Sequence, residues 1–196
     1  MTEISVLSIF LAAVFTNNIL LTNYLGMCSF LAVSSEVKAS AGLGMAVTFV
    51  MAVTSVLNWI VEHHILVPLD LVYMRYIVYI IVIAAFVQLV EMIIERVSES
   101  LYAALGIFLP LITVNCAILG ATLFIAIREY TLPQAAAYGA GGGLGWALAI
   151  VAMAGIRQKM ARARVPRGLS GAGISLVITG IMALAFIGFS GMIRIN

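Results

Sequence analysis

Residues 17–28, NNILLTNYLGMC, and residues 105–116, LGIFLPLITVNC, decide the fold of this chain. Both stretches are apolar enough to lie in a membrane, yet both carry Gly, Asn and Thr, and the second also carries Pro. Irregular backbone at membrane depth is tolerated only where it is buried in protein or lines a cavity. The two stretches end in Cys28 and Cys116, and the chain has 2 cysteines in all. Each thiol is therefore either placed to bind something or is a small inert filler.

The composition identifies an integral membrane protein. The chain has 196 residues, of which 64% are hydrophobic and 9% charged, whereas soluble domains carry about 25% charged residues. No room is left for a soluble catalytic domain, and the scattered net charge of +2 argues against a nucleic-acid partner. The acidic Glu3 precedes a long apolar run, which predicts a first transmembrane helix rather than a cleaved signal peptide.

Six apolar segments are long enough to cross a bilayer, so we expect an all-α membrane protein with six transmembrane helices. They cover residues 4–33, 41–61, 71–94, 101–127, 134–156 and 170–193. The first and fourth segments exceed the length of one crossing, and they are also the two that carry the cysteines. We expect spans one and four to be broken helices whose halves meet near the middle of the membrane.

An internal repeat predicts how these spans are arranged. Residues 41–46, AGLGMA, open the second span, and residues 142–147, GGLGWA, lie in the corresponding part of the fifth. Three spans then repeat as three, so the second half is inserted upside down, as in many transport folds. The repeat halves are about 1–97 and 98–196 within a single membrane domain. Cys28 and Cys116 fall in the first span of each half, where a pseudo-two-fold axis would bring them together.

The basic residues predict the orientation. Those following the odd-numbered spans outnumber those on the other side, which are Arg75, Arg128 and Arg194. The larger set comprises Lys38, Arg96, Arg157, Lys159, Arg162, Arg164 and Arg167. The positive-inside rule places the larger set in the cytoplasm and both termini outside. The basic 157–167 segment is then a topology anchor, or a site for anionic lipid or a soluble partner.

Two cysteines alone cannot complete an iron–sulfur cluster. A free buried Cys is commonly a packing residue. The functional alternative is ligation of a soft metal or of a [2Fe–2S] cluster, which takes about four thiolates. Because this chain supplies Cys28 and Cys116 only, that alternative requires a second polypeptide with two more cysteines. A disulfide is disfavoured, since both residues lie in mid-segment away from oxidising machinery.

Other polar residues within the apolar segments have structural and functional interpretations. The polar residues are Asn17, Asn18, Asn23, Thr113 and Asn115. The structural interpretation is that they hydrogen-bond between helices, and the functional one is that they cap broken helices or donate to cluster sulfurs. Gln88 and Glu91 lie near the end of the third span, where an intramembrane acid can be functional or can reach the interface. We expect His63 and His64 to lie exposed in a loop, and Arg75 to extend to the membrane surface.

The two cysteine segments resemble one family closely. Similarity extends to residues 154–157, 165–166 and 183–191, and covers essentially the whole chain. This family contains the A subunit of the Rnf electron transport complex and the E subunit of the sodium-pumping NADH:quinone oxidoreductase. Cys28 and Cys116 match the family's cluster-ligand positions, and Gly26, Thr113 and Asn115 adjoin them as supporting residues.

The resemblance implies an electron-carrying function within a bacterial inner-membrane complex. Two cysteines from this chain and two from a homologous subunit of opposite topology would hold one [2Fe–2S] cluster inside the membrane. The cluster would relay electrons between cytoplasmic redox subunits and a flavin-bearing subunit outside, and the electron flow would drive Na⁺ or H⁺ transport. The chain would be a subunit of a redox-driven translocase and would not be catalytic alone.

The branch of the family and the alternative functions stay open at this stage. Residues 25–34 and 146–157 look more like the quinone-reductase E subunit, whereas the compact link 65–73 looks more like the Rnf A subunit. We favour the Rnf branch, which uses ferredoxin and NAD. A small inverted-repeat secondary transporter and a scaffold subunit with inert thiols are the alternatives from other functional classes.

Overall fold

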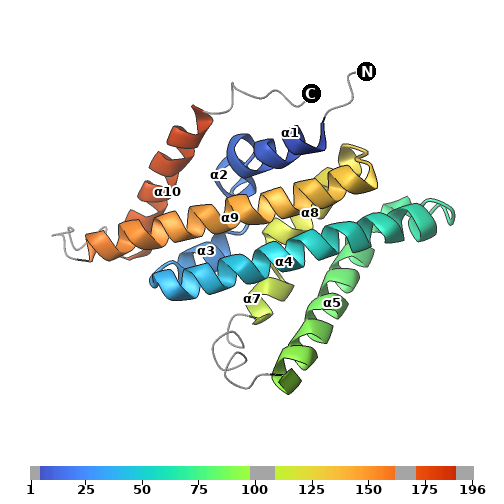
Figure 1. The fold of residues 1–196 in the computed structure, drawn as a ribbon, viewed down its shortest axis with the longest axis horizontal. Helices are drawn as coiled ribbons and strands as arrows, with labels where there is room; N and C mark the ends of the chain where they lie inside the picture. The colour runs from blue at the N-terminus through green and yellow to red at the C-terminus, as the bar shows by residue number, and fades with distance from the viewer. Residues whose placement is uncertain (1–4, 98–108, 162–170, 189–196) are drawn as a thin grey trace.

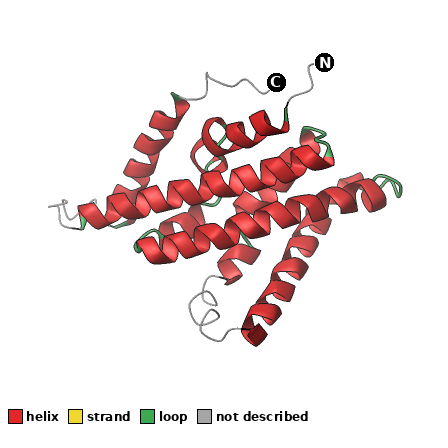
Figure 2. Cartoon of the chain, viewed as in Figure 1, coloured by secondary structure: helices red, strands yellow, loops and turns green. Residues whose placement is uncertain are grey.

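The described parts of the chain are helical throughout. The computed structural model describes residues 5–97, 109–161 and 171–188, and no strand occurs among them (Figures 1 and 2). The first half contains α1 (Val6–Leu11), the π-helix η1 (Ala12–Thr16), α2 (Ile19–Asn23), α3 (Met27–Val33), α4 (Val37–Val61), η2 (Glu62–Leu66), η3 (Val72–Met74) and α5 (Arg75–Val97). The second half contains α7 (Leu109–Thr113), α8 (Cys116–Ile127), α9 (Leu132–Met160) and α10 (Ala172–Ile187).

Four helical stretches are long and apolar enough to cross a membrane. They are Val37–Leu66, Val72–Ile93, Pro110–Ile127 and Leu132–Met160. They match the second, third, fourth and fifth predicted spans, although residues 101–108 of the fourth lie outside the described residues. The first predicted span is divided among α1, η1, α2 and α3, and the described part of the sixth is the shorter apolar helix α10.

The centre of the protein is the close antiparallel packing of α4 against α9. The two helices lie side by side in Figure 1. A Cβ on Gly44 would stand 2.9 Å from Ala147 Cβ, and one on Gly143 would stand 2.6 Å from Thr48 Cα. Small residues permit this approach, as is usual where membrane helices cross closely. The two repeated glycine motifs found in the sequence therefore pack against each other.

The α4–α9 pair carries many of the buried side chains, and α5 is peripheral. Trp146, Met51 and Leu43 are fully buried, with Phe30 of α3 beside them in the same core. By contrast, only 17% of the span that contains α5 is buried. The free face of α5 is apolar, which suits contact with lipid or with another membrane subunit.

The second span is longer than the sequence analysis predicted. Helical backbone continues beyond Val61 through η2, so His63 and His64 lie in a helix, and the prediction of a loop there was wrong. Both rings are exposed, as expected, and each Nδ1 lies 3.1 Å from a backbone carbonyl one turn earlier. Glu62 faces inward while the two histidines face outward, so the polar run is one amphipathic turn.

Candidate functional site

The first cysteine lies just after a tight reversal of the backbone. Helix α2 ends at Asn23, and both Tyr24 and Gly26 adopt left-handed conformations, with φ of 55° and 88°. Glycine tolerates such a φ at little cost, whereas other residues rarely adopt it. Gly26 is the N-cap of α3, so Cys28 is the second residue of that helix.

The second cysteine begins a helix that an asparagine caps. Helix α7 ends at Thr113, which is half-buried, and α8 begins at Cys116. Asn115 lies between the two helices, and its Oδ1 accepts a 2.9 Å hydrogen bond from the Ala117 N–H. This side-chain cap satisfies one of the N–H groups that a helix start leaves without a backbone partner.

Hydrogen bonds join these two turns although they are far apart in the sequence. The Gly26 N–H donates to Cys116 Sγ at 2.9 Å. Asn115 Nδ2 donates to Ser29 Oγ at 3.3 Å, and the Ser29 hydroxyl donates to the Gly26 carbonyl at 3.2 Å. The structure therefore brings Cys116 against the turn that precedes Cys28, and it places Gly26 and Asn115 at the junction.

Both thiols are free and exposed on the surface of this chain. Among the described residues, no group of three or more His, Cys, Asp or Glu side chains gathers in a way that could hold a metal ion. Two outward-facing cysteines fit half of a cluster site, the other half of which would come from a second polypeptide. The N–H donor on Cys116 Sγ also fits, because hydrogen bonds to sulfur ligands are usual around iron–sulfur clusters.

Asn18 holds the first cysteine segment against α9. Its Oδ1 accepts from the backbone N–H groups of Leu20 and Leu21, at 3.1 and 3.4 Å, and thereby caps α2. Its Nδ2 donates to the Gly145 carbonyl of α9 at 2.8 Å. Asn18 thus makes two of the contacts predicted for the intramembrane asparagines, a hydrogen bond between helices and a helix cap.

Arg157 caps the other end of the helix that carries Cys28. Its guanidinium donates to the Leu31 carbonyl at 3.0 Å and to the buried Ser34 hydroxyl at 2.7 Å. A cation there stabilises the carbonyl end of α3. The sequence predicted a topology anchor or a site for lipid or a soluble partner at this position, and not this cap, since the residues that Arg157 reaches are 123 or more positions away. Residues 162–167 of the basic segment lie outside the described residues.

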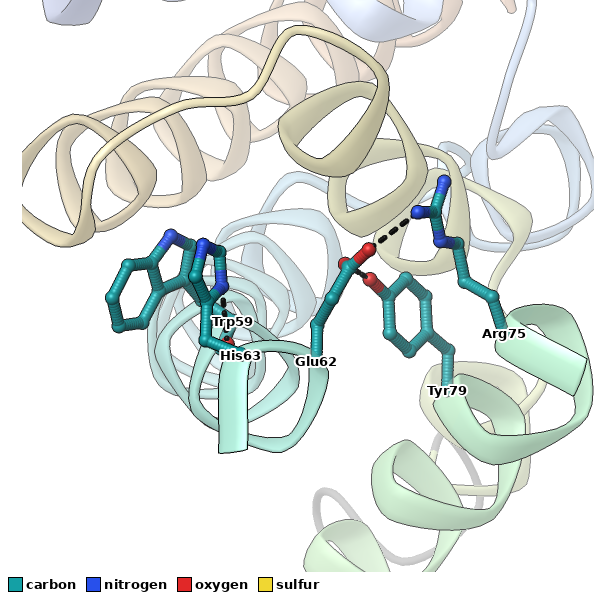
Figure 3. A network of polar contacts seen from close by, with 5 residues as sticks. All are labelled: Trp59, Glu62, His63, Arg75 and Tyr79. Carbon is teal, nitrogen blue, oxygen red and sulfur yellow. Dashed lines mark hydrogen bonds and ion pairs between the residues drawn. The ribbon is translucent and has the colours of Figure 1, made fainter. Parts of the chain in front are cut away.

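A buried ion pair was missed by the sequence analysis. Glu62 is 7% exposed, its Oε1 lies 2.5 Å from an Arg75 guanidinium nitrogen, and it also accepts a hydrogen bond from the Tyr79 hydroxyl. Figure 3 shows the carboxylate between these two groups, with the His63 ring stacked on Trp59 beside it. The sequence predicted that Arg75 extends to the membrane surface, and the structure gives it an ion pair with Glu62 that was not predicted. The sequence does contain a pattern that could have predicted this pair, because Glu62 ends one apolar run and Arg75 begins the next.

The remaining predicted polar residues lie apart from the cysteine turns. Gln88 is exposed and Glu91 is half-buried, both on the peripheral helix α5. Asn17 is the C-cap of η1, and Asn23 is exposed at the end of α2. The structure gives none of these four a hydrogen bond to a cysteine thiol.

Comparison with known proteins identifies the family. The family described as Rnf-Nqr subunit, membrane protein, matches residues 6–193. The chain belongs to this family. The matched region includes both cysteine turns and the α4–α9 pair, so the family assignment covers the whole of the site described above.

Individual relatives come from both branches of the Rnf-Nqr family. The E subunit of the Na(+)-translocating NADH-quinone reductase of Yersinia enterocolitica is 51% identical over 192 residues, covering 95% of this chain and 97% of that protein. The A subunit of the Na(+)-translocating ferredoxin:NAD(+) oxidoreductase complex of Acetobacterium woodii is 50% identical over 184 residues, covering 94% and 96%. Identity alone therefore does not separate the branches.

Proposed function

We propose that this chain contributes Cys28 and Cys116 to an intramembrane [2Fe–2S] cluster that it shares with a homologous subunit. The complex is an ion-translocating electron transport complex of the Rnf-Nqr type, in the bacterial inner membrane. The observation that carries the proposal is the contact between the two cysteine turns, in which the Gly26 N–H donates to Cys116 Sγ. Packing fillers would be buried, whereas both thiols are exposed.

The shared site follows from the count of thiols. A [2Fe–2S] cluster takes about four protein ligands, and this chain has 2 cysteines. The partner is a homologous subunit of opposite topology, which supplies two more cysteines. When bound, the cluster accepts and releases one electron at a time, which lets electrons pass between cytoplasmic redox subunits and a flavin-bearing subunit outside.

This chain's residues hold and orient the two sulfur ligands. The Asn115 cap fixes the first turn of α8 and therefore the position of Cys116. Gly26 supplies both a backbone donor and the left-handed turn that leads into Cys28. The Arg157 cap fixes the far end of α3. These contacts lie within this chain, so they hold the two cysteines in position without using the exposed face to which the partner binds.

The proposed membrane topology has six crossings as an inverted 3+3 repeat, with crossings one and four broken. Its support is the antiparallel α4–α9 pair, whose repeat motifs meet, and the helix breaks before Cys28 and Cys116. Lys38, at the start of α4, lies at the same end of this pair as Arg157 and Lys159, at the end of α9. The positive-inside rule makes that end cytoplasmic and puts both termini on the periplasmic side.

We favour the Rnf branch, with the quinone-reductase E subunit as the alternative. The alignment with the reductase relative runs over 192 positions, but 95% of this 196-residue chain is about 186 residues, so this chain has no residue at about six of those positions. The alignment with the ferredoxin:NAD(+) oxidoreductase relative runs over 184 positions and takes in 94% of the chain, which is all 184. This difference agrees with the compact 65–73 link. Both relatives' names specify Na⁺, which makes Na⁺ the first ion to test against H⁺.

The test is the iron content and the EPR spectrum of the purified complex, with Cys28→Ala and Cys116→Ala beside the wild type. We expect each substitution to abolish one [2Fe–2S] signal while the complex remains assembled by size-exclusion chromatography. Thr48→Ala, at the α4–α9 contact, is the matched control and should keep the signal. If iron and signal survive both cysteine substitutions, the thiols are packing residues, and a transporter or scaffold function replaces the proposal.

Two further measurements assign the branch and the ion. An Rnf complex should reduce NAD⁺ with reduced ferredoxin, whereas the quinone-reductase alternative should oxidise NADH with quinone. Uptake of ²²Na⁺ into proteoliposomes, with and without a protonophore, distinguishes direct Na⁺ transport from H⁺ transport. Collapse of uptake by the protonophore would exclude Na⁺ as the directly pumped ion.

A further inference from the structure

Trp146 places a buried hydrogen-bond donor next to the two cysteine turns. The side chain is 0% exposed, and among the described residues its Nε1 has no hydrogen-bond partner. An indole N–H can only donate, and a buried donor without an acceptor destabilises the fold. A buried group held at that cost needs a reason, most simply an acceptor that belongs to the assembled complex.

The position of the indole identifies the site that this acceptor would occupy. Trp146 Nε1 lies 2.4 Å from the point where a Cβ on Gly26 would stand, and Ala117 Cβ lies 3.0 Å from the same point. Gly26 donates to Cys116 Sγ and is two residues before Cys28, while Ala117 directly follows Cys116. The indole nitrogen is therefore packed into the junction of the two cysteine turns.

Neighbouring contacts hold the indole there while leaving its N–H free among the described residues. The carbonyl of the adjacent Gly145 accepts from Asn18 Nδ2 at 2.8 Å, which ties this turn of α9 to the first half of the chain. The nearby Gly26 carbonyl already accepts from the Phe30 N–H and from the Ser29 hydroxyl, at 3.1 and 3.2 Å. The backbone on both sides of the indole is thus held by other bonds, and both of these carbonyls accept from donors other than the indole.

We propose that Trp146 is a positioning residue whose indole N–H donates to sulfur at the two-cysteine site in the assembled complex. This inference rests on the proposed function. A donor near cluster sulfur stabilises the reduced, more negative form, and therefore raises the reduction potential. Trp146 would act beside the Gly26 N–H as a second donor, one from a side chain and one from the backbone.

The chain provides its own control, because it contains 2 tryptophans. The other, Trp59, donates its indole N–H to the Tyr130 carbonyl at 2.7 Å and belongs to the Glu62 end of α4. Trp146→Phe and Trp59→Phe remove the same chemical group from the two places. Trp146→3-benzothienylalanine is the second variant, because it keeps the shape of the indole and lacks the N–H.

The experiment is pulsed EPR of the reduced, ¹⁵N-tryptophan-labelled complex, together with redox titration of the cluster signal. We expect an indole ¹⁵N and exchangeable-proton coupling in the wild type and in Trp59→Phe, and its loss in both Trp146 variants. We also expect about a tenfold fall in the equilibrium constant for one-electron reduction in the Trp146 variants, equivalent to about 59 mV. A purely structural role would give no indole coupling in the wild type and an unchanged potential in the shape-matched variant.

Two results would overturn the inference, and they differ in what they imply. If the coupling and the potential are unchanged in Trp146→3-benzothienylalanine, Trp146 is not a donor to the site, while the cluster itself stands. If the wild-type complex shows no cluster signal at all, both the proposed function and this inference fail.

Discussion

Gly26→Ala should destabilise the chain by two separable effects. The residue has a φ of 88°, and a left-handed conformation costs a non-glycine residue about 1–2 kcal/mol. The added Cβ would also stand 2.4 Å from Trp146 Nε1 and 3.0 Å from Ala117 Cβ. Overpacking of this kind costs about 1–3 kcal/mol, so the total loss is about 2–5 kcal/mol.

Two other glycines separate the strain from the crowding. Gly171 has a φ of 91° and a ψ of −127°, a conformation that also favours glycine, and no other described residue lies within 4 Å of its Cβ position, so Gly171→Ala should cost only a backbone term of about 1–3 kcal/mol. Gly155 lies in α9 with an ordinary φ and open space around it. Gly155→Ala should be neutral or should stabilise by up to about 1 kcal/mol, because Ala is the better helix former.

The assay is unfolding of the purified protein by SDS titration, followed by far-UV circular dichroism, for the three alanine variants in parallel. A double variant, Gly26→Ala with Trp146→Phe, should recover part of the crowding term, since the two sites are in contact. The expected order of loss is Gly26, then Gly171, then Gly155. If the double variant shows no coupling between Gly26→Ala and Trp146→Phe, the indole does not crowd the turn and its assigned position is wrong.

Three further predictions concern buried polar groups. Asn115→Ala removes the cap of α8 and the hydrogen bond to Ser29, and it should lower the stability by about 1 kcal/mol. Alkylation of Cys116 by maleimide should become faster, and an unchanged rate would contradict a role of Asn115 in fixing that thiol. Arg75→Met leaves the charge of the Glu62 carboxylate uncompensated and should lower the stability by about 3–5 kcal/mol. The double variant with Glu62→Gln should lose less stability, and equal losses in the SDS titration would mean that the two residues are not coupled. Asn58 is 1% exposed, and its side-chain amide atoms have no hydrogen-bond partner among the described residues. Asn58→Leu should therefore stabilise the protein by about 1–3 kcal/mol. A loss of stability would instead indicate a water or an ion bound at the amide.

Apolar length and glycine content predicted much of the scaffold. The helices Val37–Leu66, Val72–Ile93 and Leu132–Met160 follow from runs of apolar residues, and the helix boundaries before Cys28 and Cys116 lie at Gly26 and Asn115 in such runs. Membrane helices reveal themselves in this way because lipid forces the backbone bonds to close within each helix. The sequence did not predict that the helix continues past Val61. The run Glu-His-His is polar enough to resemble a loop, and the sequence does not show that Glu62 faces inward while the histidines face outward.

Contacts across the sequence could not be predicted in the same way. Nothing local to Arg157 indicates that its guanidinium will reach the carbonyl end of α3, and a single sequence contains no pairwise information. Glu62 and Arg75 are closer in sequence, but their pairing depends on where α4 ends, which apolar length defines poorly. The cysteines were found by their setting, whereas the donor to Cys116 Sγ comes from a residue 90 positions away.

The large sequence separation of these contacts also determines the order in which they can form during synthesis. Asn18 bonds to Gly145, 127 residues later, and Arg157 reaches Leu31, 126 residues earlier. A ribosome releasing the chain from its N-terminus therefore exposes the turn of Cys28 long before the helix that supports it has been synthesised. Local contacts form early and distant ones late. The turn of Cys28 therefore reaches its final geometry only after α9 has been synthesised, so the proposed cluster would have to be inserted into a nearly complete polypeptide.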